Sequence, residues 1–133
     1  MSDNGSKNPV DAVNSVLAEL YKARDDLKKA KKLTTLTKVQ SANDQIRAAK
    51  KAFKDNGKEF TDKAHLISVK SEDLILIDLK EWREVDLFKK GAEWRYLEVR
   101  VKLHGFVKEA LEKCEDCVCK MEMIRDELSI KNR

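Results

Sequence analysis

The sequence has no hydrophobic run long enough to span a bilayer, and its first residues are too polar to resemble a signal peptide. It has three cysteines, an odd number, and all of them lie between residues 114 and 119, which does not fit a framework of disulfides. The sequence therefore argues against the membrane-spanning class and the disulfide-rich secreted class. We expect a soluble cytoplasmic protein with reduced thiols, no membrane contact, no metal and no cofactor.

No catalytic motif stands out either, so we expect a protein that is not an enzyme. The 133 residues fit one domain, and 41% hydrophobic residues make the chain too apolar to be disordered. Charged residues reach 39%, a surplus that suits long exposed helix faces. The net charge is only +4, but residues 21–60 hold 12 Lys and Arg against 5 Asp and Glu, so the positive charge is concentrated there.

Residues 9–57 predict two amphipathic helices. Asn8 and Pro9 are typical of a helix start, and Asp55-Asn56-Gly57 is typical of a helix end. The apolar series of the first helix is about one residue out of phase with that of the second, and three threonines lie between them. This favours a helical hairpin over the alternative, one unbroken helix.

Trp94 to His104 predicts a β-strand. Leu97, Val99, Val101 and Leu103 alternate with charged residues, and alternation places one kind of side chain on each face of a strand. Glycines at residues 91 and 105 bracket the stretch.

Three weaker segments precede this strand. Residues 65–69 and 83–88 alternate over short stretches, and residues 74–79 are apolar on both faces, which predicts a central strand. A buried helical turn that begins at Ser71 is the alternative for residues 74–79. We expect three or four antiparallel strands, with residues 83–88 and 94–104 forming a hairpin.

From residue 106 the apolar period changes to 3.6, which predicts an amphipathic helix over residues 106–130 that covers the apolar face of the sheet. The predicted fold class is thus α+β: an N-terminal helical hairpin, a small antiparallel β-sheet of 3–4 strands over residues 65–104, and a C-terminal amphipathic helix packed on it. We divide the chain into a disordered tail (1–8), a hairpin or coiled-coil-like extension (9–57) and an α+β core (58–133).

The favoured functional hypothesis is a small interaction or assembly protein that forms a homo-oligomer or binds a protein partner. The first helix has a narrow apolar stripe and no obvious place on so small a sheet. The candidate interface residues on this stripe are Val13, Leu17, Leu20 and Leu27.

The second hypothesis is a nucleic-acid-binding accessory protein. Arg47, Lys50, Lys51 and Lys54 recur at helical spacing and form one basic stripe, which could neutralise successive phosphates. The plainer explanation is that cations near a helix C-terminus favour its dipole.

Two further patterns are weak. Cys114, Cys117 and Cys119 resemble a zinc motif, but on a helix the first two lie on the apolar face and the third points away, so we expect ordinary buried thiols. Asp78-Leu79-Lys80 resembles the acidic residue, spacer and lysine of metal-dependent nucleases, with Asp62 or Asp73 as a second ligand. The same three-residue pattern occurs at Asp26, as chance predicts in a chain this charged.

The tryptophans and histidines complete the candidates. Trp82 and Trp94 are expected to pair across the predicted hairpin and stabilise the sheet, although an exposed pair could bind a partner. His65 and His104 are isolated in the sequence, and we assign them no chemistry.

Overall fold

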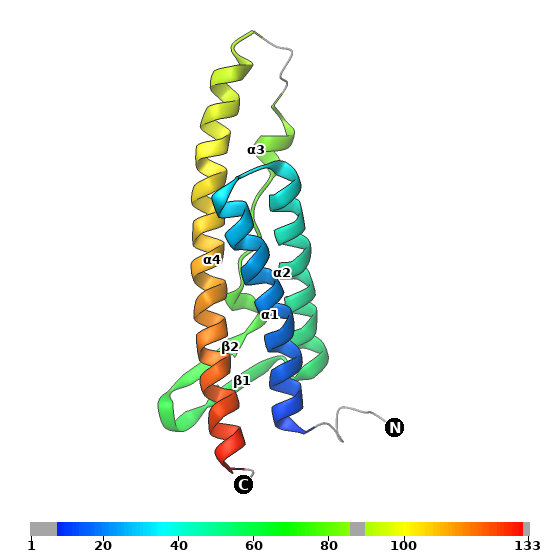
Figure 1. The fold of residues 1–133 in the computed structure, drawn as a ribbon, viewed down its shortest axis with the longest axis vertical. Helices are drawn as coiled ribbons and strands as arrows, with labels where there is room; N and C mark the ends of the chain where they lie inside the picture. Colours follow the sequence, from blue (N-terminus) through cyan, green and yellow to red (C-terminus); the bar gives the residue numbers. More distant parts are fainter. Residues whose placement is uncertain (1–7, 86–89, 132–133) are drawn as a thin grey trace.

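The computed structural model describes residues 8–85 and 90–131 of the chain, and it is mostly helical (Figure 1). Three long helices dominate it: α1 (Pro9–Lys32), α2 (Leu36–Asn56) and α4 (Ala92–Lys131). Two short strands, β1 (Glu59–Asp62) and β2 (Ile67–Lys70), and a one-turn helix, α3 (Lys80–Arg83), lie between α2 and α4 in the sequence. In the described residues, no helix combines the length and the apolar character needed to cross a bilayer.

The predicted helical hairpin is confirmed. The Asn8 side chain accepts a hydrogen bond of 2.9 Å from the Val10 amide at the start of α1. The chain then turns after Lys32, and the Thr35 side chain accepts a hydrogen bond of 3.3 Å from the Lys38 amide, which caps α2. Gly57 ends α2 with φ at +142°, a conformation that a glycine adopts readily. Residues 9–57 therefore form two helices and not one.

The predicted strand over residues 94–104 is wrong, because these residues form the first turns of α4. Residues two apart lie on nearly opposite sides of a helix, whereas residues four apart share a side. Val99 and Leu103 are 3% and 2% exposed and face inward, while Leu97 and Val101 are 49% and 73% exposed and face outward. The alternation thus reflects two opposite apolar faces of one helix.

The sheet is correspondingly smaller than predicted. In the described residues, β1 and β2 form the whole sheet, an antiparallel pair with Phe60 opposite Val69. The expected strand over residues 65–69 is confirmed from Ile67 onward, but residues 74–79 belong to no strand. Arg83 belongs to α3 instead of a strand, and the rest of the expected strand over 83–88 extends into residues outside the described ones.

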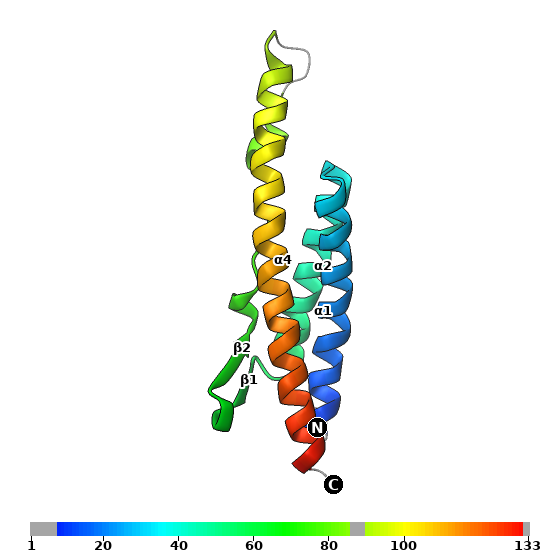
Figure 2. The ribbon, with the colours of Figure 1, turned by 60° about the vertical axis from the view of Figure 1, so that its left-hand side comes forward.

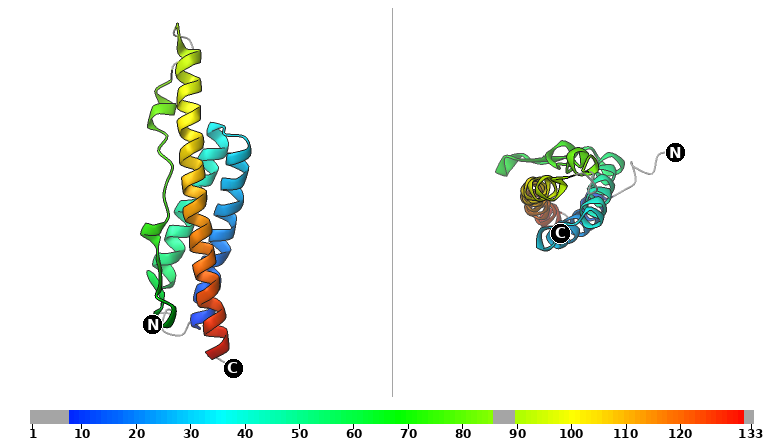
Figure 3. Two further views of the ribbon diagram at one scale, coloured as in Figure 1. Left: turned by 90° about the vertical axis from the view of Figure 1, so that its left-hand side faces the viewer. Right: turned by 90° about the horizontal axis from the view of Figure 1, so that it is seen from above.

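Residues 74–79 nevertheless run extended, beside α4 and α2 (Figure 3). Asn43 on α2 replaces the missing strand partner: its amide nitrogen donates to the Ile77 carbonyl at 2.9 Å, and its side-chain oxygen accepts from the Ile77 amide at 2.8 Å. Both residues are buried. Because both backbone groups of Ile77 are satisfied, this segment packs in the interior without a sheet.

One hydrophobic core joins these elements. Helix α1 packs against both α2 and α4, and the segment from β2 to residue 79 closes the opposite side. The predicted C-terminal helix is therefore present, but it starts at Ala92. It packs against α1 and the β1–β2 hairpin and not on a broad sheet. The predicted boundary at residue 57 stays a prediction, since it concerns how the two segments fold when separated.

Replacement of Asn43 by Leu should lower the free energy of unfolding by about 3 kcal/mol, because it leaves two buried backbone groups of Ile77 without partners. Urea denaturation followed by circular dichroism measures this difference. The control is Asn14→Ala at an exposed position of α1, which should change stability by less than about 0.5 kcal/mol. Equal effects of the two substitutions would contradict the role given to Asn43.

Gly105 and Gly91 provide a matched pair, because an added Cβ meets no atom within 4 Å at either position. Gly105 lies inside α4, so Gly105→Ala should raise the free energy of unfolding by about 0.5 to 1 kcal/mol. Gly91 has φ at +83°, so Gly91→Ala should lower it by about 1 kcal/mol. The same urea titration at low protein concentration tests both, and effects of equal sign would contradict the assigned backbone conformations.

Candidate functional site

The candidate interface residues of α1 lie inside the molecule. Val13, Leu17, Leu20 and Leu27 are each at most 1% exposed and belong to the core shared with α2 and α4. As an interface they would require α1 to separate from the rest of the chain. Their role in self-association stays a prediction. The exposed apolar side chains lie in another part of the chain.

That part is the N-terminal end of α4, which extends beyond the turn between α1 and α2 (Figure 2). Its inner side is covered by α3: the rings of Trp82 and Tyr96 lie 5.2 Å apart. Glu81 of α3 reaches both Lys102, at 3.4 Å, and Arg95, at 3.9 Å. The helix is thus held on one side by a short segment that the sequence did not predict.

The outer side of the same end carries exposed apolar side chains, which no other described segment covers. Trp94 is 74% exposed, and Leu97 and Val101 follow it at spacings of three and four residues. We call these three residues the distal face. The expected pairing of Trp82 with Trp94 is wrong, because Trp82 packs on Tyr96 while Trp94 lies on the distal face. Burying such a face would be favourable by about 25 cal/mol per Å² of apolar surface.

The predicted basic stripe lies on α2, and three of its four cations have partners within the chain. Arg47 lies 3.0 Å from Asp44, and Lys51 lies 2.9 Å from Asp55. Lys50 donates a hydrogen bond of 3.2 Å to the Ser71 carbonyl. The fourth, Lys54, lines a hollow of about 490 Å³ together with residues of both charge signs. Nucleic-acid binding through this stripe stays a prediction.

The cysteines lie as predicted on α4. Cys114 and Cys117 are buried and Cys119 is exposed. The Cys114 thiol donates a weak hydrogen bond of 3.6 Å to the Leu20 carbonyl. Burial raises the pKa of Cys114 to about 11 and that of Cys117 to about 12, so both remain protonated at neutral pH. Both side chains belong to the hydrophobic core, where they pack as small apolar groups.

Asp78, the acidic residue of the nuclease-like pattern, accepts a hydrogen bond of 2.9 Å from the Lys80 amide at the start of α3. Asp73 similarly accepts one of 3.0 Å from the Lys70 amide. In the described part of the chain, no group of three metal-ligating side chains includes Asp78. The local hydrogen bonds account for both carboxylates, and the nuclease hypothesis gains no support from their positions.

Comparison with known proteins adds no family to this description. No protein-family model matches the chain, and neither the curated proteins nor the solved structures include a significant match.

A thiol-specific reagent such as 5,5′-dithiobis(2-nitrobenzoate) should react with Cys119 alone in the native protein at pH 8, and with all three cysteines after unfolding. The release of the coloured thiolate counts the reactive groups. Cys119→Ser should remove the native reaction completely. Rapid reaction of a second thiol in the folded protein would show that Cys114 or Cys117 is more accessible than its burial implies.

Proposed function

We propose that the protein is a non-enzymatic interaction or assembly protein that pairs with a second copy of itself through the distal face. The observation that carries this proposal is the exposed apolar side of α4 at Trp94, Leu97 and Val101. Because α3 already covers the opposite side of this end, the exposed residues do not serve the fold of a single chain. An exposed apolar patch of this kind marks an interaction site.

Helix geometry favours an antiparallel arrangement of the two copies. Consider a two-fold axis perpendicular to α4 near residue 100. With 1.5 Å rise per residue, the side chains of Leu97 and Val101 from the two copies then alternate along the seam. Trp94 of each copy then comes to the level of Gly105 in its partner, within about 2 Å along the axis. A Cβ added at Gly105 meets no neighbouring atom within 4 Å, so the glycine leaves the surface of α4 open at this level.

Charges at the two ends of the distal face fit the same arrangement: Lys108 follows Val101 by seven residues on the same side of α4, and Glu93 precedes Trp94. Glu93 and Lys108 are 15 residues apart, so they lie about 22 Å apart along one helix and cannot form an ion pair within one copy. In the antiparallel pair, Glu93 of each copy lies near the level of Lys108 of the other. Arg100 lies at the level of the two-fold axis, well to the side of the seam.

The proposal predicts a concentration-dependent equilibrium between monomer and dimer, measured by sedimentation equilibrium on the full chain. Val101→Lys places a charge in the seam and should weaken dimerisation at least tenfold. Lys113→Glu, at an exposed position of α4 away from the distal face, is the control for a change of charge alone. A wild-type chain that stays monomeric at every concentration would overturn self-association, and salt-sensitive retention of that monomer on DNA would favour the nucleic-acid hypothesis.

A charge exchange in the same assay tests the antiparallel geometry. Glu93→Lys and Lys108→Glu should each weaken dimerisation by a few-fold, as expected for ion pairs at the edge of an interface. The double variant should restore it, because the exchanged charges again face each other between copies. Failure of the double variant to recover, while Val101→Lys still disrupts the dimer, would reject the antiparallel arrangement and keep the distal face as the interface.

A further inference from the structure

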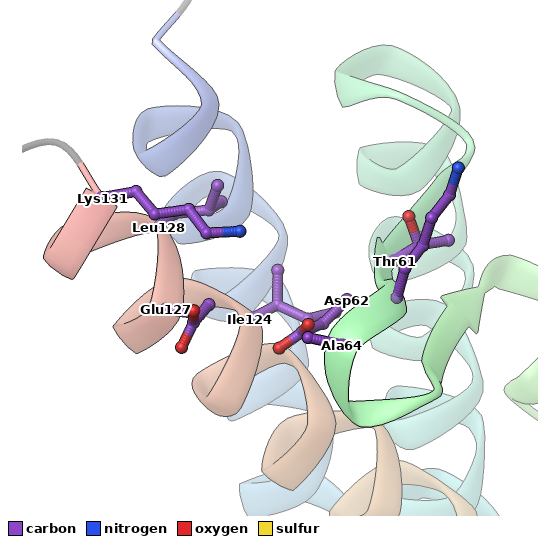
Figure 4. A pocket seen from close by; sticks show the side chains of 8 residues that line it. Thr61, Asp62, Ala64, Ile124, Glu127, Leu128 and Lys131 are labelled. Atoms are coloured by element: carbon purple, nitrogen blue, oxygen red, sulfur yellow. The ribbon is translucent and has the colours of Figure 1, made fainter.

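A second convergence of side chains lies at the other end of α4. Here the turn after β1 approaches the last turns of α4 around a cavity of about 280 Å³ (Figure 4). Asp62 ends β1, and Glu127 projects from α4 on the opposite wall. Lys63 and Lys131 also line the cavity. Segments 65 residues apart in the sequence thus meet at one place.

Asp62 holds His65 in place. Its buried carboxylate accepts a hydrogen bond of 3.4 Å from the His65 amide, as the cap of the short 3-10 turn over Lys63–His65. The other carboxylate oxygen lies 2.7 Å from Nδ1 of the His65 ring. The hydrogen bond from His65 is the main reason that the pKa of Asp62 is lowered, so this carboxylate is ionised at neutral pH.

Glu127 completes the group. It is half-buried, and in the described residues its carboxylate has no hydrogen bond and no ion pair, with Lys131 or any other cation. One ligand atom each from Asp62, His65 and Glu127 lie within 4.8 Å of one another. Two carboxylates and one imidazole therefore lie close together, although Lys63 and Lys131 line the same cavity.

This ligand set has the chemistry of a transition-metal site. Imidazole and carboxylate together suit Zn²⁺, whereas Mg²⁺ and Ca²⁺ prefer oxygen ligands alone. Zinc bonds to nitrogen and oxygen measure about 2.0 to 2.2 Å, so ligand atoms around one tetrahedral ion lie about 3.3 to 3.6 Å apart. The three side chains must therefore rearrange when the ion binds, and the His65 side chain, which is 54% exposed, has room to move. Asp62 and Glu127 also line the cavity, which gives a solvent molecule access to these two ligands.

We propose that Asp62, His65 and Glu127 bind one divalent transition-metal ion, with Zn²⁺ the best fit. The ion joins the turn after β1 to the last turns of α4, so it fastens the small hairpin to the helix. Lys63 and Lys131 reduce the affinity through their positive charge, which places the site among weak metal sites. The proposal is independent of self-association, because the distal face lies at the opposite end of α4.

Titration of the full chain with ZnCl₂, followed by calorimetry and by ¹H NMR of the histidine rings, tests the site. Cys119→Ser serves as the background, since its exposed thiol is an alternative zinc ligand. We expect one binding event that shifts the ring signals of His65 and leaves those of His104 unchanged. The chain has only these two histidines, so His104 is an internal control. MgCl₂ should produce neither effect.

Two variants assign the ligands. Glu127→Gln keeps the shape of the side chain and removes its charge, and it should weaken zinc binding at least tenfold; His65→Ala should abolish it, whereas His104→Ala should leave it unchanged. Zinc should also raise the melting temperature of the parent protein and not that of Glu127→Gln. Absence of binding by the parent protein, or equal affinity in the Glu127→Gln variant, would overturn the proposal.

Discussion

The length of α4 is the constraint on which the rest of the structure depends. At 40 residues it measures about 60 Å, while α1 and α2, with 24 and 21 residues, measure about 36 and 32 Å. The helical hairpin can therefore cover only part of α4. The chain between α2 and α4 extends the cover along the remaining length, and its two contacts with Asn43 hold it in that position. At the N-terminal end of α4 this cover lies on one side alone, and the distal face is the opposite side.

The sequence predicted helix ends better than it predicted the sheet. Asn8, Thr35 and Gly57 act through local hydrogen bonds and local backbone angles, so their roles could be inferred from a few neighbouring residues. The alternation over residues 97–103 fits a strand and also a helix with two opposite apolar faces, and only the surroundings of α4 decide between them. Asn43 gave no local signal, because its partner lies 34 residues away.

The candidate sites divide in the same way, into those set by neighbouring residues and those set by contacts between distant segments. The burial of Cys114 and Cys117 and the exposure of Cys119 follow from helical spacing alone, and the sequence predicted them correctly. The distal face was hidden by the strand interpretation, although Trp94, Leu97 and Val101 have the spacing of one helix side. The group of Asp62, His65 and Glu127 could not be predicted, since it depends on how the hairpin after α2 meets the far end of α4. The apolar stripe of α1 was recognised, but its partner is the chain itself.

The length of α4 also separates charges at its two ends. Glu127 and Val101 are 26 residues apart, which corresponds to about 39 Å along the helix, several times the screening distance of about 8 to 10 Å in physiological salt. A charge gained at one tip is therefore not felt electrostatically at the other. The helix instead fixes a distance. An antiparallel pair centred near residue 100 would hold the two β1–β2 hairpins, one in each copy, about 80 Å apart.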